Sequence, residues 1–154
     1  MTTTPSITFN DVCFGYSPEA RLLDGVNFTL TPGERVALVG TNGSGKTTLL
    51  HLAVGLLFPQ RGCVQLFGQP CRTEKDFRPL RHRVGLLFQN PDDQLFCPTV
   101  AEDIAFGPLN MGCSTEEAHR RVTEVLGQVG LTGYEEHVTY KLSGGEKRLV
   151  SLAA

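Results

Sequence analysis

The stretch "GTNGSGKT", Gly40 to Thr47, matches the phosphate-binding pattern G-x-x-x-x-G-K-[ST]. Its glycines let the backbone turn tightly, so that successive N–H groups and the positive end of a following helix point at phosphate oxygens. Lys46 adds a mobile positive charge for the β- and γ-phosphates, and the Thr47 hydroxyl is placed to ligate Mg²⁺. The pattern therefore predicts a nucleotide site built from Gly40, Thr41, Asn42, Gly43, Ser44, Gly45, Lys46, Thr47 and Thr48.

The residues around this loop favour phosphate binding over a plain glycine-rich turn with a surface lysine. "RVALVG" (35–40) is a continuous apolar run, typical of a strand covered on both faces, and "KTTLLHLAVGL" (46–56) is typical of a helix. The sequence thus predicts strand, loop and helix in the order that the pattern requires. The loop alone leaves the class of enzyme open, because small-molecule kinases, GTPases and many ATPases share it.

A second glycine pair lies near the end of the chain, in "LSGGE" (142–146). Ser143 is a good helix N-cap, and the residues from Glu146 to Ala154 are strong helix formers that no stop signal follows. Taken alone, this pentapeptide indicates only a glycine turn before a helix.

Taken together, the phosphate loop, "LSGGE", the intervening "LLFQNPDDQLF" and the tyrosine of "FGYSP" resemble the ABC-type ATPase family, in which "LSGGE" is the signature motif. Within the family, "FQNPDDQLFCPTVAEDIAFGPLNMG" is most similar to ATPase subunits of energy-coupling-factor importers for cobalt, nickel and vitamins. The resemblance spans essentially the whole chain. It implies an α/β fold of the P-loop NTPase class and ABC type, with a mixed sheet core, an N-terminal antiparallel β layer and a helical subdomain.

The resemblance also implies roles for single residues. Tyr16 would stack on the adenine ring, although an ordinary edge-strand tyrosine is the alternative. Gln89 would reach the Mg²⁺ and the attacking water and would sense the transporter, and the alternative for it is a polar strand end. Lys46 and Gln89 are thus the expected catalytic residues, and Thr47 and Gln89 the expected metal ligands.

The family's signature implies that Ser143, Gly144 and Gly145 close over the γ-phosphate held by a second subunit, again through helix N-terminal amides. Two residues depart from the common pattern. Thr41 stands where proline is frequent, and Glu146 stands where glutamine is frequent. Neither change removes a phosphate contact, but Glu146 places a negative charge near an anionic ligand.

Hydrophobic patterning predicts strands first and helices later. Alternating apolar residues indicate an edge-type β layer in 7–14 and 26–30, and "CVQLF" (63–67) and "VGLLFQ" (84–89) indicate further strands. After residue 89, two capping-box spacings announce helices, Thr99 with Glu102 and Ser114 with Glu117. We expect one domain over 1–154, with a nucleotide-binding α/β lobe over 1–89 and a mainly helical subdomain over 90–154.

Composition limits the classes of partner. The net charge of -2 gives no general attraction to nucleic acid or to an anionic membrane surface. The five cysteines are odd in number and contain no C-x-x-C pair, which argues against a disulfide framework or a zinc site. No signal peptide or membrane-spanning run is recognisable, so no direct membrane insertion is expected and the cytosol is the expected compartment.

The family's later motifs are not found in these residues. No apolar strand ending in Asp-Glu occurs, and all four histidines precede the signature. The resemblance therefore implies a C-terminally incomplete domain. We expect it to bind nucleotide with little or no turnover, because the water-activating carboxylate is missing, and to be poorly soluble, because the flank of "RVALVG" would lack its neighbouring strands.

The resemblance implies an ATP-hydrolysing subunit, using ATP and Mg²⁺, of an importer for cobalt, nickel or vitamins. Two such subunits, identical or paralogous, would sandwich ATP and move a transmembrane subunit from the cytoplasmic face of the membrane. The alternatives are a non-catalytic nucleotide-binding fragment of a broken reading frame and a soluble ABC ATPase of translation or DNA maintenance. A small-molecule kinase would not need "LSGGE".

Overall fold

The computed structural model describes residues 4–17 and 19–154. The chain divides into two compact units, residues 1–86 and residues 87–154. The first unit is a sheet with one main helix, and the second is helical.

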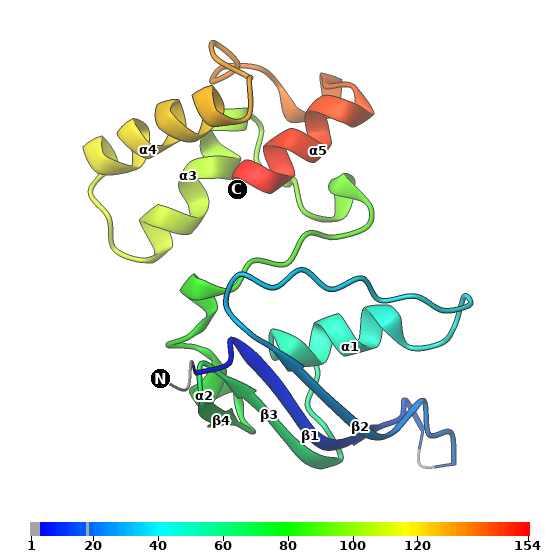
Figure 1. The fold of residues 1–154 in the computed structure, drawn as a ribbon. Helices are drawn as coiled ribbons and strands as arrows, with labels where there is room; N and C mark the ends of the chain where they lie inside the picture. The colour runs from blue at the N-terminus through cyan, green and yellow to red at the C-terminus, as the bar shows by residue number, and fades with distance from the viewer. Residues whose placement is uncertain (1–3, 18) are drawn as a thin grey trace. The chain divides into compact units, whose positions relative to one another are not determined.

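The sheet of the first unit has four antiparallel strands in the order β2-β1-β3-β4 (Figure 1). They are β1 (Ile7–Phe14), β2 (Leu23–Leu30), β3 (Arg61–Leu66) and β4 (Gln69–Cys71). The predicted β layer in the first thirty residues and the predicted strand in 63–67 are confirmed. Phe9 lies opposite Phe28 on one side and Val64 on the other, so alternate apolar residues of the central strands share one face.

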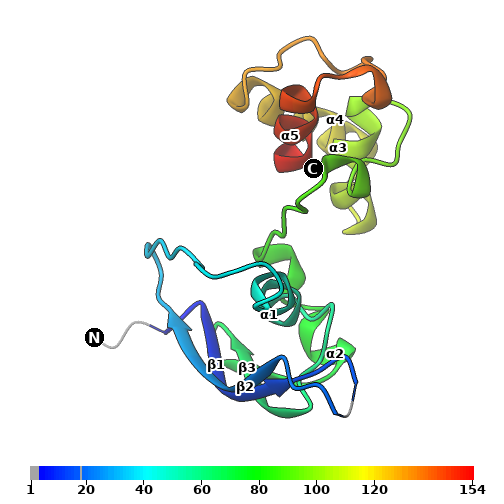
Figure 2. The same ribbon diagram turned by 90° about the vertical axis from the view of Figure 1, so that its right-hand side faces the viewer.

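Helix α1 (Lys46–Ala53) covers that face, as Figures 1 and 2 both show. Two short helices, α2 (Glu74–Phe77) and η1 (Arg81–Arg83), follow the sheet. The buried core of this unit joins residues from the strands and the helices: Phe9, Val12, Phe14, Leu23, Leu52, Ala53, Val64, Leu66, Cys71, Phe77 and Leu80.

Two predicted buried strands are wrong. Residues 35–40 and 84–89 have no strand structure and pair with no other segment among the described residues, and the Val39 side chain is 92% exposed. A buried strand must find ladder partners on its flanks, and the sheet formed here is antiparallel and ends at β2 and β4. These two apolar segments therefore have no neighbouring strand to pair with among the described residues, and neither forms a strand.

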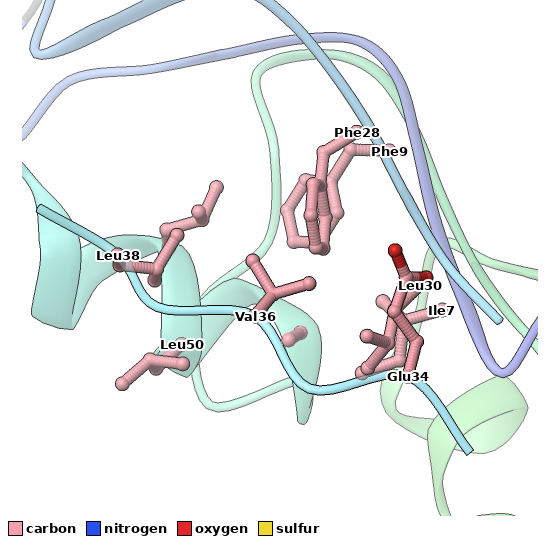
Figure 3. Close-up of a pocket in the computed structure, with 10 residues that line it drawn as sticks. Ile7, Phe9, Phe28, Leu30, Glu34, Val36, Leu38 and Leu50 are labelled. Atoms are coloured by element: carbon pink, nitrogen blue, oxygen red, sulfur yellow. The ribbon is translucent and has the colours of Figure 1, made fainter. Parts of the chain in front are cut away.

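Part of segment 35–40 nevertheless contacts apolar groups. Val36 and Leu38 face Phe9, Phe28 and Leu50 across a pocket of about 160 Å³ between the sheet and α1 (Figure 3). Glu34 is the one charged residue among those that line this pocket, and the others are apolar. Its carboxylate accepts hydrogen bonds from the backbone N–H and the hydroxyl of Thr31, both at 2.9 Å. Those bonds lower the pKa of the Glu34 carboxyl.

The second unit packs three helices around one core: α3 (Val100–Asn110), α4 (Thr115–Gln128) and α5 (Gly144–Ala153). The short helices η2 (Pro91–Asp93) and η3 (Thr139–Lys141) precede α3 and α5. The predicted apolar face of α4 is confirmed, and the core consists of Val100, Ile104, Val122, Leu126, Leu131, Leu142 and Val150.

The helix caps follow the sequence with one exception. Thr99 with Glu102 and Ser143 with Glu146 form complete capping boxes. Ser114 also caps α4 by accepting the Glu117 N–H at 3.2 Å, but the Glu117 carboxylate does not reach back to it. That carboxylate bonds Arg120 and Arg121 instead, and these bonds lower the Glu117 pKa to about 2.

All five cysteines are free thiols, of which Cys13 and Cys71 are buried. Within residues 4–17 and 19–154, no group of three or more His, Cys, Asp or Glu side chains is placed to hold a metal ion. In the same described part of the chain, no helix combines the length and apolarity needed to cross a membrane.

Candidate functional site: a phosphate loop and a capped signature helix

The backbone of the phosphate loop needs its glycines. Gly43 has φ of 80° and Gly45 has φ of 91°, both in the left-handed region that side chains disfavour. Gly45 is also the N-cap of α1, and a Cβ atom there would lie 2.9 Å from Cδ2 of Leu23. The loop is thus seated directly on β2, and helix α1 starts where the predicted helix does, at Lys46.

Lys46 folds back over the loop. Its Nζ donates to the carbonyl oxygen of Gly40 at 2.9 Å and to that of Thr41 at 2.7 Å, and it lies 3.5 Å from the Ser44 hydroxyl. The ammonium group is therefore held at the mouth of the loop beside the first turn of α1. Since a helix leaves its first N–H groups without intrahelical acceptors, these amides and the ammonium are together able to hold an anion.

The two threonines that follow Lys46 are placed differently. Thr47 is exposed, so its hydroxyl is available to a metal ion, whereas the Thr48 side chain is buried and 3.1 Å from the Tyr16 hydroxyl. Thr48 can therefore serve a nucleotide only through its backbone N–H. The structure brings Tyr16 to the loop, where its ring makes an edge contact with Phe14 and remains 70% exposed.

The chemistry of these donors fits a polyphosphate with Mg²⁺. Left-handed glycines leave the loop backbone open, with no atom within 4 Å of a Cβ built at Gly43. Lys46 supplies a positive charge for phosphate oxygens, and Thr47 supplies the neutral oxygen that a hard cation accepts. A flat exposed ring at Tyr16 stands beside the same helix.

Gln89 and the signature residues belong to the second unit. Gln89 is exposed in the turn before η2, and the N–H of Phe88 donates to Oε1 of Gln94 at 3.4 Å. Asn90 caps η2 by accepting the Asp92 N–H at 3.3 Å. The short helix η2 thus fixes the backbone on the C-terminal side of Gln89, whereas the strand predicted on its N-terminal side, over 84–89, is not formed.

The signature helix α5 begins with exposed Ser143, Gly144 and Gly145. Ser143 Oγ accepts the Glu146 N–H at 3.3 Å, and the Glu146 carboxylate accepts the Ser143 N–H at 2.7 Å. Tyr134 donates its hydroxyl to the same carboxylate at 2.8 Å. The bonds from Ser143 and Tyr134 lower the pKa of Glu146. Its negative charge is thus committed to the cap, which is a structural use for the departure from glutamine.

Sequence reasoning missed several residues that hold these segments. The capping-box spacing indicates the role of Glu146, but nothing local marks Tyr134, Gln94 or Lys147, because their partners are distant in the chain or depend on helix orientation. Asp103 is a further case: it is 4% exposed and accepts the N–H groups of Phe96 and Cys97. A charged residue in an apolar helix face is the only sequence signal for it.

Comparisons with known proteins agree with this arrangement. A family model described as ABC transporter matches residues 23–154. The energy-coupling factor transporter ATP-binding protein EcfA of Methanocaldococcus jannaschii is 46% identical over 93% of this chain and 52% of its own length. EcfA of Methanothermobacter thermautotrophicus is 47% identical over 96% of this chain and 48% of its own length.

Solved structures agree as well. CbiO1 of Clostridium perfringens, described as part of the ABC transporter complex CbiONQ, has a TM-score of 0.85 and 32% identity, covering 97% of this chain and 60% of that one. A dimeric ATP-binding cassette in a post-hydrolysis state, bound to ADP and Pi, has a TM-score of 0.81 and 26% identity, covering 96% of this chain and 67% of that one. The ABC ATPase fold class is thereby confirmed, for a chain that spans about half the length of the curated relatives it matches. With the phosphate loop, the capped signature helix and the family match all in one sequence, the chain belongs to the ABC transporter family of ATP-binding proteins.

Proposed function

We propose that the chain binds Mg²⁺-ATP and is the ATP-hydrolysing subunit of an ABC-type importer. The observation that carries the proposal is the Lys46 ammonium held against the carbonyls of Gly40 and Thr41, at the positive end of α1. A phosphate group entering there would replace the two carbonyls as the partner of the Lys46 ammonium. Because phosphate oxygens carry a negative charge and carbonyl oxygens do not, the ammonium would bind the phosphate more strongly than it binds its own loop. Thr47 would hold the metal ion, and Tyr16 would take the adenine ring.

The complete site would need two subunits. The amides at the start of α5, at Ser143, Gly144 and Gly145, would close over the γ-phosphate bound by the loop of the partner. Gln89 would meet the Mg²⁺ and the attacking water. The similarity to a dimeric ATP-binding cassette bound to ADP and Pi supports this assembly. Homodimer and heterodimer are both compatible with it.

The second unit offers a surface for a membrane subunit. Phe96, Phe106, Leu109 and Met111 are exposed apolar side chains on or beside α3, and Phe96 and Phe106 make an edge-to-face pair at 4.8 Å. A groove of about 520 Å³ runs along the same helix past His119. Such a patch fits an amphipathic helix, and its first residue, Phe96, lies a few residues after Gln89 in the chain. The subunit would thus lie on the cytoplasmic face of the membrane without entering it.

The importer class would be that of cobalt, nickel or vitamins. The resemblance of residues 88–112 to energy-coupling-factor ATPases and the likeness to CbiO1 support this class. Uptake of labelled Co²⁺, Ni²⁺ and vitamins into proteoliposomes holding the full protein and its membrane partner would identify the cargo. Uptake independent of ATP for all of them would contradict the proposal.

Nucleotide binding is tested most directly by Lys46→Ala. Titration with a fluorescent ATP analogue and Mg²⁺ should show binding to the wild type and a loss of at least about tenfold in affinity for the variant, since a charge-assisted contact to phosphate is removed. Lys75→Ala, at an exposed position of helix α2, is the matched control and should bind as the wild type does. Equal binding by all three proteins, or by none, would refute the proposal.

We expect the 154-residue chain by itself to bind nucleotide and to turn it over slowly or not at all. Phosphoryl transfer needs a group that positions the attacking water, and no apolar strand ending in Asp-Glu occurs in this sequence. Release of phosphate by the isolated chain at a rate typical of ABC ATPases would contradict that expectation.

A further inference from the structure

Two polar links join the segment after Gln89 to the signature helix α5. The Lys147 ammonium lies 2.5 Å from the Asp92 carboxylate, and the Gln94 side-chain amide donates to the Ser151 carbonyl oxygen at 2.6 Å. The partners are 55 and 57 residues apart in sequence. Lys147 is only 16% exposed in its side chain, so its ion pair is shielded on one side.

The two links grip one face of α5. Lys147 and Ser151 are one helical turn apart, and Asp92 and Gln94 lie at η2 and just after it. The Gln94 amide thus bonds the backbone of α5 itself, at the Ser151 carbonyl oxygen, while Asp92 bonds a side chain of the same helix.

Gln94 also reaches the other side of Gln89. Its Oε1 accepts the N–H of Phe88 at 3.4 Å while its amide nitrogen holds Ser151. One side chain therefore connects the residue before Gln89 to α5. Asp103, on α3, fixes the next residues by accepting the N–H groups of Phe96 and Cys97 at 3.1 and 3.0 Å. The exposed apolar patch and the signature helix are thus bound to the same short segment.

We infer that Asp92, Gln94 and Lys147 form a strut that carries movement of the segment after Gln89 to the amides at the start of α5. This inference rests on the proposed function, in which that segment meets a membrane subunit and those amides meet ATP. The three are positioning residues, because none of them touches nucleotide in this scheme. The strut gives the membrane subunit control over closure of the nucleotide site.

The geometry makes the coupling direct. A helix rises about 1.5 Å per residue, so Ser143 lies roughly 6 Å from Lys147 along a rigid rod. A tilt imposed at Lys147 and Ser151 therefore shifts the first amides of α5. Leu142 and Val150 hold the helix to the core through apolar contacts. Their side chains cannot form an ion pair or a hydrogen bond with η2. Removing the strut should thus leave α5 folded while freeing it from the segment after Gln89.

The test uses the full protein assembled with its membrane partner in nanodiscs. Asp92→Lys and Lys147→Asp each break the ion pair, and the double variant D92K/K147D restores it with reversed charge. Glu136→Lys, at an exposed site of the same unit, controls for a change of charge. The readouts are the ATPase rate with and without the membrane partner, and the KM for Mg²⁺-ATP.

Each single variant should lower the stimulated rate about two- to thirtyfold, the range for residues that carry coupling between sites, with little change in KM. The double variant should recover most of the stimulation, and E136K should behave as the wild type. A double variant as impaired as the singles, or singles equal to E136K, would overturn the inference. Rescue by charge reversal is a result that general loss of stability does not produce.

Gln94→Leu gives an independent measurement if a charge variant does not fold. It keeps the side-chain volume but removes both bonds, so amide hydrogen exchange should quicken over residues 144–150 and stay unchanged in α4. Unchanged exchange at 144–150 would also overturn the inference. Failure of the proposed function is recognised separately, because Lys46→Ala would then leave ATP binding and hydrolysis as in the wild type.

Discussion

Replacement of Asp103 by alanine should loosen the turn that carries the exposed apolar patch. One carboxylate oxygen of Asp103 accepts both the Phe96 N–H at 3.1 Å and the Cys97 N–H at 3.0 Å, and the residue is 4% exposed. Its other oxygen is buried and has no hydrogen-bond partner among the described residues. Burial of the Cys97 thiol raises its pKa, and the Asp103 carboxylate raises it further.

The magnitude follows from the two bonds. A hydrogen bond to a charged group contributes about 1.5–3 kcal/mol. The two bonds together contribute less than twice this amount, because they share one acceptor oxygen and because the exposed Phe96 segment can bond water once they are lost. We therefore expect D103A to lower the free energy of local opening of this turn by about 2–4 kcal/mol. Asp103→Asn keeps an acceptor oxygen of the same shape, and since neutral bonds are about half as strong, it should lose about 1–2 kcal/mol.

Native-state hydrogen exchange measures this loss at the two amides concerned. At about 1.4 kcal/mol per factor of ten, exchange of the Phe96 and Cys97 amides should quicken roughly 30- to 700-fold in D103A and about 5- to 30-fold in D103N. Amides in the centre of α4 are the internal control. Equal exchange in wild type and D103A would refute the assignment of Asp103 as the anchor. A loss in D103N as large as in D103A would show that charge, and not the acceptor position, is what matters.

As pH falls, the cap of α5 should weaken: the folded-state pKa of Glu146 is lowered, so its stabilisation is complete above the ordinary carboxyl pKa and is lost as pH drops through the lowered value, which pH-dependent exchange of α5 would reveal. Tyr134→Phe should move the Glu146 pKa up toward its ordinary value in an NMR titration, because one donor to the carboxylate is gone. Val122→Ala should destabilise the second unit by about 1.5–3 kcal/mol in urea unfolding, since Val122 is 1% exposed. Val39→Lys should raise the soluble yield of the 154-residue chain, and an unchanged yield would contradict the expectation that segment 35–40 limits its solubility.

The sequence was a good guide wherever a signal is local. Residues three apart in the sequence predict the caps at Thr99 and Ser143, and alternating apolar residues along each strand predict the β layer. The phosphate loop is readable for the same reason, because its glycines and Lys46 are adjacent and need only the start of α1. Partners close in the chain meet whatever the rest of the fold does.

Prediction failed where structure depends on distant partners. Residues 35–40 are apolar throughout, yet a strand exists only when neighbouring strands pair with it, and β propensity is a property of that context. Ser114 shows the same limit on a smaller scale: the spacing to Glu117 is correct, but two arginines one turn on outcompete the cap for the carboxylate. Spacing states which bond is possible, and the charges nearby decide which one forms.

The phosphate loop forms although the segment before it has no strand partners, and the reason lies on its helical side. Gly45 packs on Leu22 and Leu23, the Thr48 side chain bonds Tyr16, and the Lys46 ammonium closes the loop on its own carbonyls. Each of these contacts involves α1 or β2, and none needs residues 35–39 to be paired. The loop geometry that we propose recognises phosphate is therefore held by β2 and α1, so we expect affinity for a nucleotide to persist where the pairing of a central strand is absent.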